Sequence, residues 1–536
     1  MAATRKTRPD SVSGRSVPAF LKRIKVCVAH CPHVMVFFFL VWIWAGFWYD
    51  DVFLMAREYS FFAFDRLLMH PVWEQPYGSL WLVGRALLVL FAWPWMGGLV
   101  LAVILALMSW LTGCLFRLSV RWRFLQYIPA LCYLYILKWT GFDAYVFAEP
   151  GRILGIPFCM MLILALQVGF LRTFTHRHLP WIWKCQADEI GRWNGVWTGL
   201  VLLAVVGAGL YGNLVRPEVR VTARLQRLMW NRQWNEMSRT AEEWKGSCRP
   251  VAAYHAVALV RNGRLLDDLF KVRYDFQPIH LTSRKGTPSI GREIYEADCN
   301  FHAGLIQAAC RNDMEQMTLD GISTVRLRRL VRCALLRGET NLALRYLLVL
   351  SRQPFEDKFV ACYRQLAAHP EQLRKDPELG DIMETEPLED QFESAFMRPL
   401  FIGYYLGMKQ ARNRKSHDMA TAASLYARML PLFLYRAAAY AESGYYPPVV
   451  ADALGMMKAG NVPAAASFTH VEAQTGRYVN FARTFSGTDT LAIYRQAIRQ
   501  FDDYKGYYPY YYYFGHPEMA SNLLGDLQEQ EKGGIN

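Results

Sequence analysis

The feature that most constrains this chain is a series of long apolar runs that stops at residue 215. The last run, residues 196–215, carries no charged side chain. Its length of about 20 residues is what an α-helix needs to cross a bilayer. Residues 216–536 contain no further run of this kind. We therefore expect an all-α protein with a polytopic transmembrane domain at residues 33–215, followed by a water-soluble domain.

The charged residues divide the chain at the same point. Of the 60 Lys and Arg residues and the 46 Asp and Glu residues, only 19 and 10 precede residue 216. The net charge of +14 has a membrane explanation, because basic residues collect in cytoplasmic loops. No helix-turn-helix, zinc-finger or RNA-recognition signature is present, so we expect no nucleic acid partner. The 11 cysteines have no regular spacing, which disfavours a disulfide framework.

Five membrane spans are predicted from the apolar runs and the charges that flank them. The basic residues 1–32 are expected to form a cytoplasmic tail. The predicted spans are residues 33–48, 98–116, 125–139, 153–171 and 196–215. With the tail inside, five spans place the soluble domain outside, and the lipid bilayer is the first expected partner.

Residues 80–93 are predicted to form an interfacial or re-entrant helix rather than a span. Counting them as a span would move the basic loops 117–123 and 172–194 to the outer side, against the positive-inside rule. Arg85 on this helix is expected to snorkel to the aqueous boundary. Residues 52–79 are expected to include an amphipathic helix on the membrane surface. The alternative of six spans, with a cytoplasmic soluble domain, stays open.

Residues 216–536 are expected to fold into helical hairpins. Three stretches follow the scheme of a helix, a Gly turn and a second helix: residues 254–270, 331–347 and 436–454. Gly263, Gly338 and Gly444 would each end a helix in the left-handed conformation. The scheme resembles the tetratricopeptide-type hairpin, although the spacing between units is irregular. That resemblance implies a curved surface that holds a peptide or protein. A packed α-domain without a groove is the alternative.

The soluble domain contains two further clusters of one residue type. The segment 504–514 holds seven tyrosines, whose rings suit interfaces because they are apolar with a polar tip. We expect it to cap the last helices, with sugar stacking or membrane contact as alternatives. The basic stretch 326–332 is expected to be a solvated helix face rather than an anion-binding site.

The layout as a whole resembles a group of uncharacterised multi-span membrane proteins found mainly in Bacteroides-type bacteria. The matching parts are an aromatic first loop at residues 50–80, the helical hairpins, and the Tyr-rich residues 507–514. The resemblance implies an address in the bacterial cytoplasmic membrane and no particular activity.

Asp50 and Asp51 are the candidate catalytic residues. They follow the first predicted span, which is similar to the start of membrane glycosyltransferases that use lipid-phosphate sugars. In those enzymes an acidic residue of the first outer loop acts as a base or helps to hold a metal, and carboxylates suit both tasks. Asp143, Glu149 and Arg152 would belong to the same site. Those enzymes usually have many more spans, and the alternative is that Asp50 and Asp51 only end a helix.

No other motif indicates a reaction. The residues 27–33 contain Cys and His without a zinc spacing. A phosphate-binding Gly loop, a nucleophile elbow and a His-Glu-x-x-His motif are absent from the sequence, so no cofactor or metal is expected. The leading hypothesis is a protein whose helical domain, periplasmic if the chain has five spans, recruits or scaffolds a protein partner at the cell envelope. The alternative is a glycosyltransferase-like enzyme acting on a lipid-linked sugar.

Overall fold

The computed structural model describes most of both predicted domains. The described residues are 32–116, 118, 120–174, 195–207, 209, 216–275, 292–387 and 411–515. Within these ranges all regular structure is helical, which confirms the all-α prediction. The predicted tail, apart from Pro32, and the last residues of the fifth predicted span lie outside the described residues.

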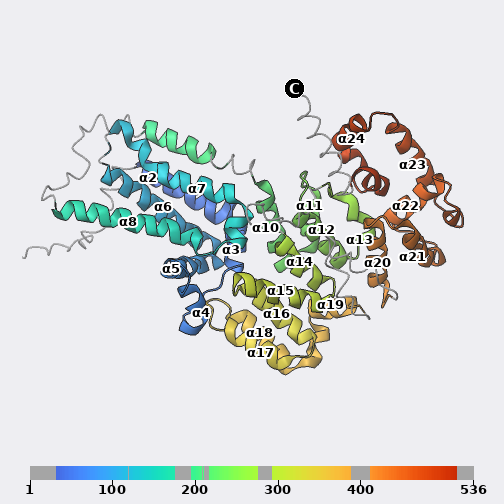
Figure 1. The fold of residues 1–536 in the computed structure, drawn as a ribbon, viewed down its shortest axis with the longest axis horizontal. Helices are drawn as coiled ribbons and strands as arrows, with labels where there is room; N and C mark the ends of the chain where they lie inside the picture. The colour runs from blue at the N-terminus through green and yellow to red at the C-terminus, as the bar shows by residue number, and fades with distance from the viewer. Residues whose placement is uncertain are drawn as a thin grey trace, which may run out of the picture.

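The first half is a bundle of antiparallel helices (Figure 1). Its members are α2 (Pro32–Ile43) with its continuation η1 (Trp44–Trp48), α6 (Pro94–Leu115), α7 (Ile128–Thr140), α8 (Arg152–Phe174) and the helix Gly195–Gly207. Proline stands in the first turn of α6 and α7, where its missing N–H costs nothing. Among the described helices, only α6 and α8 are long and apolar enough to span a membrane, with a third span if α2–η1 and the following helix form one bent by 65°. The five-span domain stays a prediction.

Contacts between helices fix the direction in which each one runs. At one end of the bundle lie His33 against Tyr127, Gly113 against Gln126, and Trp197 stacked on Phe124. At the other end lie Lys138 over Trp44 and Tyr49, Trp42 bonded to the carbonyl of Trp95, and Gly141 against Arg216. The chain therefore passes along the bundle five times, and it begins and leaves at opposite ends.

Between η1 and α6 the chain leaves the bundle and forms a separate helical segment. It consists of α3 (Asp50–Glu58), α4 (Arg66–Trp73), α5 (Gly78–Leu88) and η2 (Val89–Ala92). The predicted helix at residues 80–93 corresponds to α5 and η2. It packs across the start of α8, where a Cβ on Gly84 would lie 1.9 Å from the carbonyl oxygen of Gly151. The two backbones can approach this closely only because both positions are glycine.

The expectation that Arg85 snorkels is wrong. Its side chain is buried and forms a bidentate ion pair with Glu149, with N–O distances of 2.5 and 2.7 Å. It also donates a hydrogen bond to the carbonyl of Phe61. Because Glu149 directly precedes α8, a carboxylate is within reach, and the guanidinium does not need water.

The second half is a set of α-helices packed largely in antiparallel pairs. They are α10 (Pro217–Trp230), α11 (Trp234–Glu242), α12 (Arg249–Asn262), α13 (Leu265–Asp268), α14 (Arg292–His302), α15 (Ile306–Asp320), α16 (Thr324–Leu336), α17 (Thr340–Leu350), α18 (Asp357–Ala368), α19 (Leu379–Thr385), α20 (Arg414–Tyr426), α21 (Leu430–Ser443), α22 (Pro448–Ala459), α23 (Glu472–Thr484), α24 (Thr490–Arg499) and α25 (Tyr508–Tyr510). The main pairs are α11/α12, α14/α15, α16/α17, α20/α21 and α22/α23.

The three predicted Gly turns are confirmed, but the pairing of their helices differs from the prediction. Gly263, Gly338 and Gly444 have φ values of 67°, 75° and 66°. Only the middle stretch is a packed hairpin, formed by α16 and α17. At the other two turns the glycine lies between pairs, because α12 packs on α11 and α21 packs on α20. A sequence pattern marks where a helix ends, whereas the partner of each helix depends on its apolar face.

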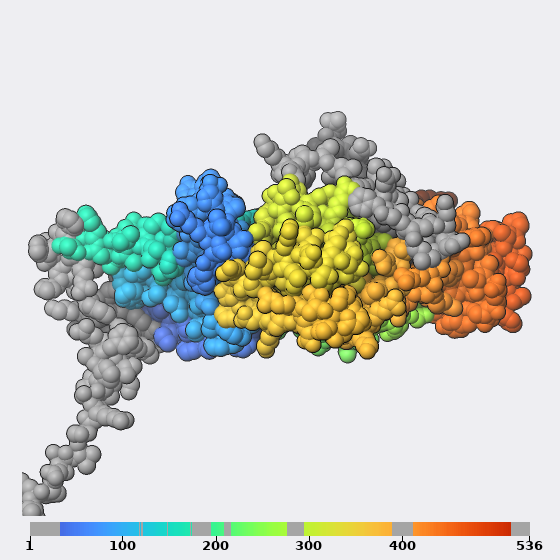
Figure 2. All heavy atoms as spheres, turned by 90° about the horizontal axis from the view of Figure 1, so that it is seen from below, coloured from blue at the N-terminus to red at the C-terminus, as the bar shows by residue number. Residues whose placement is uncertain are grey.

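The two halves share a continuous hydrophobic core. One cluster of buried side chains runs from Phe37 in α2 through Val219 in α10 to Tyr511 near the end of the described chain. A second cluster joins Phe61 and Met69, from the segment around α4, to the helices α15 to α19. The bundle and the helical domain therefore form one elongated body (Figure 2).

Candidate functional site

The candidate residues Asp50 and Asp51 lie at the junction between the bundle and the helical domain. They occupy the first turn of α3, and Arg227 of α10 contacts both, at 2.6 Å from Asp50 and 2.7 Å from Asp51. Their carboxylates are only 16% and 13% exposed. Burial and the neighbouring charge of Asp51 raise the pKa of Asp50, against the opposing effect of Arg227. The pair joins two helices that lie far apart in the sequence.

The other acidic and basic residues predicted for this site are only partly brought together. Asp143 begins η4 (Asp143–Phe147), which packs on α3. Glu149 is instead paired with Arg85, and Arg152 lies over the ring of Trp81 at 5.5 Å. Among the described residues, no group of three or more His, Cys, Asp or Glu side chains is placed to hold a metal. A catalytic role for Asp50 and Asp51 stays a prediction.

The end of α3 carries a buried cluster of four charges, which we call the junction cluster: Arg57, Glu58, Arg328 and Glu356. Arg57 contacts Glu58 at 2.5 Å and Glu356 at 2.9 Å. Arg328 of α16 contacts the same two carboxylates, at 3.0 and 2.7 Å. Burial would raise the pKa of Glu58, but the charges of Arg328 and Arg57 outweigh it and hold the pKa below its ordinary value. Two positive and two negative charges thus cancel in the interface.

Neutral hydrogen bonds surround the junction cluster. The backbone N–H and the hydroxyl of Thr324, at the start of α16, both donate to the carbonyl of Ser60, at 3.1 and 2.7 Å. The hydroxyl of Tyr59 donates to the carbonyl of Ile294 at 3.0 Å and accepts from Gln226 at 3.1 Å. The residues that follow α3 are therefore bonded directly to three helices of the helical domain.

The expectation of a solvated basic face at residues 326–332 is wrong. Arg329 is buried and contacts Asp298 and Asp313, while Arg332 contacts Tyr363 at 2.8 Å and Glu378 at 3.6 Å. Each partner lies on another helix or in a loop. The sequence signal was the density of arginine on one helix, and it could not show that carboxylates from elsewhere would cover it.

The Tyr-rich segment fills a seam between the first and last parts of the helical domain. The hydroxyls of Tyr508 and Tyr511 donate to the carbonyls of Leu425 and Tyr426, at 3.2 and 2.6 Å, at the end of α20. The N–H of Gly506 donates to the carbonyl of Phe270. The segment covers the last helices as predicted, and it also binds the region after α12.

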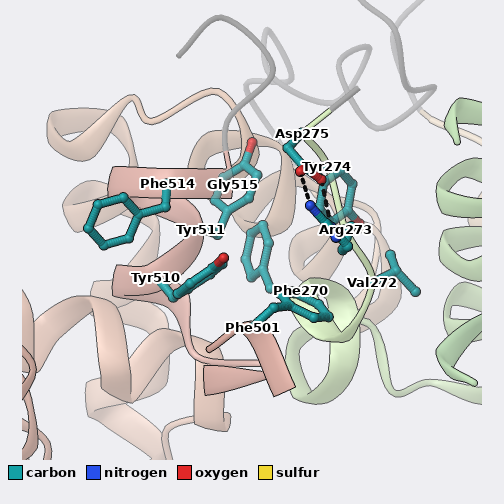
Figure 3. A pocket seen from close by; sticks show the side chains of 10 residues that line it. All are labelled: Phe270, Val272, Arg273, Tyr274, Asp275, Phe501, Tyr510, Tyr511, Phe514 and Gly515. Carbon is teal, nitrogen blue, oxygen red and sulfur yellow. Dashed lines mark hydrogen bonds and ion pairs between the residues drawn. The ribbon is translucent and has the colours of Figure 1, made fainter. Parts of the chain in front are cut away.

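A small hollow of about 10 Å³, room for about one water molecule, lies beside this segment, and ten residues line it. Figure 3 shows Tyr510, Tyr511 and Phe514 on one side, facing the ion pair of Arg273 and Asp275. The rings pack closely on one another and on Phe270, with Tyr511 and Phe270 centred 4.2 Å apart. The close ring packing leaves no room in this hollow for a sugar or a peptide side chain.

One carboxyl group near the Tyr-rich segment is buried in surroundings that disfavour its charged form. Asp452 of α22 is 8% exposed, and its nearest cation, Arg477, lies 3.6 Å away and is half exposed. Arg477 also stacks on the ring of Tyr507 at 4.0 Å. Burial raises the pKa of Asp452 from 3.8 to about 7. This group titrates near neutral pH without any ligand.

The comparisons with known proteins give one match. The model of a family of unknown function (DUF6057) matches residues 142–515. The match begins just after α7, at the end of the bundle next to the helical domain. It extends through α8 and the described helical domain to Gly515. Asp50, Asp51 and the segment around α4 precede it. No curated protein and no solved structure matches the chain.

We expect Glu356→Gln to destabilise the protein strongly. Removing this charge leaves Arg57 and Arg328 buried with only Glu58 as counter-charge, and breaking a buried ion pair costs about 3–5 kcal/mol. The measurement is the Tm of the full chain in detergent micelles. The control is Glu243→Gln, which removes an exposed pair with Arg239 (65% and 81% exposed) and should cost less than about 0.5 kcal/mol. Equal Tm values for both variants would contradict the structural role of the junction cluster.

We expect Asp452→Asn to alter how stability depends on pH. The folded state holds the Asp452 proton up to about pH 7, whereas the unfolded state releases it near 3.8. The free energy of unfolding of the wild type therefore falls by at most about 4 kcal/mol as the pH rises from about 4 to 7. It does not change further above pH 7. The variant should exceed the wild-type Tm at pH 8 and lose that advantage at pH 5. A constant difference between the two pH values would show that Asp452 has an ordinary pKa.

Proposed function

Since the chain belongs to the family of unknown function DUF6057, we propose a function from its own geometry. It is a bacterial inner-membrane protein that holds its helical domain rigidly on the periplasmic side, as a platform that recruits a protein partner. Three features support this function: the membrane placement of the bundle, the rigid junction, and an exposed surface on α21.

The distribution of apolar and basic residues supports the membrane placement. Large apolar side chains of α8 point outward from the bundle, among them Ile163, Leu166 and Phe170, which are 49%, 73% and 60% exposed. The end of the bundle where α2 begins is also where α7 begins, close to Trp197. The sequence before α7 and the sequence after α8 are basic, at residues 117–123 and 172–194. By the positive-inside rule that end is cytoplasmic, and the helical domain lies at the other end.

The junction supports a rigid platform rather than a tethered domain. A domain on a flexible linker leaves its surface charges in water, whereas here the four charges of the junction cluster are largely buried between the two halves. Arg227 with Asp50 and Asp51 adds a second charged contact beside it. Buried ion pairs are stable only in one geometry, so the orientation of the helical domain relative to the membrane is fixed.

The observation that carries the recruitment of a partner is the outer face of α21. Its inner face is buried on α20 through Phe433, Ala437 and Tyr440, whereas Tyr435 and, just after the helix, Tyr445 are 78% and 60% exposed. Ala438, Ala439 and Ala441 between them are exposed as well. Exposed tyrosines beside small residues are typical of protein-binding surfaces. An apolar or aromatic segment of a partner would fit this face.

A glycosyltransferase-like reaction is the second function considered for this chain. No specific observation favours it over recruitment, because the carboxylates of Asp50 and Asp51 are both bound to Arg227. The tetratricopeptide likeness contributes only the Gly turns to the proposal, since the helix pairing departs from the predicted scheme.

We expect a reporter that is active only in the periplasm to be active when fused after Asn536, and one active only in the cytoplasm to be inactive there. The reverse pattern is expected for fusions before Met1, because five passes separate the two ends. A cytoplasmic signal after Asn536 would contradict the periplasmic placement and support six spans.

We expect a photoreactive benzoylphenylalanine in place of Tyr435 to form a discrete adduct with another protein in intact cells. The control site is Leu348 on α17, which is 56% exposed and lies outside the proposed surface. Adding Tyr445→Asp should lower the yield of the Tyr435-site adduct, because it places a charge in an apolar contact. The same adducts at both sites, or none at Tyr435, would remove the basis for recruitment through α21.

A further inference from the structure

The segment around α4 exposes large apolar side chains that nothing in the described structure covers. Phe64, Leu67, Trp73 and Tyr77 are 87%, 85%, 60% and 76% exposed. Three of these values exceed the highest value on the outer face of α8, which is 73% at Leu166, and Trp73 equals Phe170 at 60%. We call these four residues the α4 edge. Contiguous apolar patches on a soluble protein generally mark a binding surface.

The α4 edge is held in place from behind. Met69 and Val72, on the opposite face of α4, are buried, and Phe61 and Ala63 belong to the core shared with α15 to α19. The carboxylate of Asp65 caps the start of α4 by accepting from the N–H of Leu67 at 2.9 Å. The exposed side chains thus project from a helix that is fixed to the helical domain.

The turn after α4 is also specified by the sequence. Tyr77 has a φ of 65°, a strained conformation for a residue with a side chain. Gly78 lies so close to the end of α4 that a Cβ there would be 2.2 Å from the carbonyl oxygen of Trp73. This turn reverses the chain into α5 and leaves Tyr77 exposed beside Trp73.

The α4 edge lies at the level of the outer end of the bundle. α4 packs on α5, and α5 packs on α8 around Gly84 and Gly151. The exposed apolar face of α8 begins a few residues further on, at Ile156. Figures 1 and 2 show the segment projecting sideways from the body beside the start of α8, between the bundle and the yellow helices of the helical domain.

We propose that the α4 edge inserts into the outer leaflet of the bilayer and anchors the helical domain to the membrane surface. The inference rests on the membrane placement proposed for the bundle. The lipid leaflet is the favoured occupant because the α4 edge continues the apolar face of α8 at the depth where tryptophan and tyrosine collect in membrane proteins. Arg66, His70 and Glu74 are exposed beside these apolar side chains, and polar or charged residues next to an exposed apolar surface are typical of interfacial helices.

The anchoring has a mechanical role. Because α4 shares a core with α15 to α19, the leaflet contacts the helical domain at a point to the side of the bundle. Two separated attachments, the bundle and the α4 edge, determine the tilt of the helical domain as well as its height.

The test uses the full chain in native membranes, with benzoylphenylalanine placed singly at Leu67, Leu166 or Tyr435. Illumination is followed by mass spectrometry of the adducts. Leu166, on the outer face of α8, reports whether the bundle is in lipid, and Tyr435 is the water-exposed control. All three side chains are 73% to 85% exposed, so the substitutions should not disturb folding. We expect phospholipid adducts at Leu67 in a yield comparable with Leu166, and none at Tyr435.

Two results would overturn the inference in distinguishable ways. In the first, Leu166 gives lipid adducts, whereas Leu67 gives none or gives adducts to another protein or a second copy of this chain. That result would leave the membrane placement intact and remove the anchor. An absence of lipid adducts at Leu166 would remove the membrane placement itself, and the anchor with it.

Discussion

The junction cluster is the interaction on which the rest of the structure depends. Moving a guanidinium or a carboxylate out of water costs several kcal/mol, and only a complete set of partners compensates that cost. Arg57 and Glu58 come from α3, whereas Arg328 and Glu356 come from the helical domain. Either part alone would present one guanidinium and one carboxylate to a largely apolar interface, each without its partner from the other part. The two halves therefore define each other's position.

Buried or partly buried ion pairs recur at the end of the bundle next to the helical domain. Arg85 with Glu149 fastens α5 to α8, and Arg227 with Asp50 and Asp51 fastens α10 to α3. In each case the partners belong to segments that enter or leave the bundle. Apolar packing in the bundle core has no strong orientation preference, since similar side chains slide past one another. Charged pairs at the ends supply the directional contacts that apolar helices lack.

The sequence predicts features that depend on neighbouring residues, and it does not predict contacts between residues far apart in the chain. Apolar runs and the glycines that end helices, such as Gly263 and Gly444, are local features and were recovered. The short helix of residues 78–92 was recognised because loop charge counts disfavoured a span there. Glu356 lies 299 positions from Arg57, and no local pattern marks a partner at that distance. For the same reason Arg85 and Arg329 were expected in water, although carboxylates distant in sequence bury them.

The contact between Gly506 and Phe270 has a consequence for how the helical domain unfolds. In an open stack of helical repeats, each unit touches only its neighbours, and units can be lost one at a time from either end. Here the final segment returns to the region after α12 and ties the last helices to the first. The array is a closed loop of contacts with no free terminal repeat. Unfolding should proceed in one cooperative step instead of fraying, and a nick between α12 and α20 would leave the fragments bound to each other.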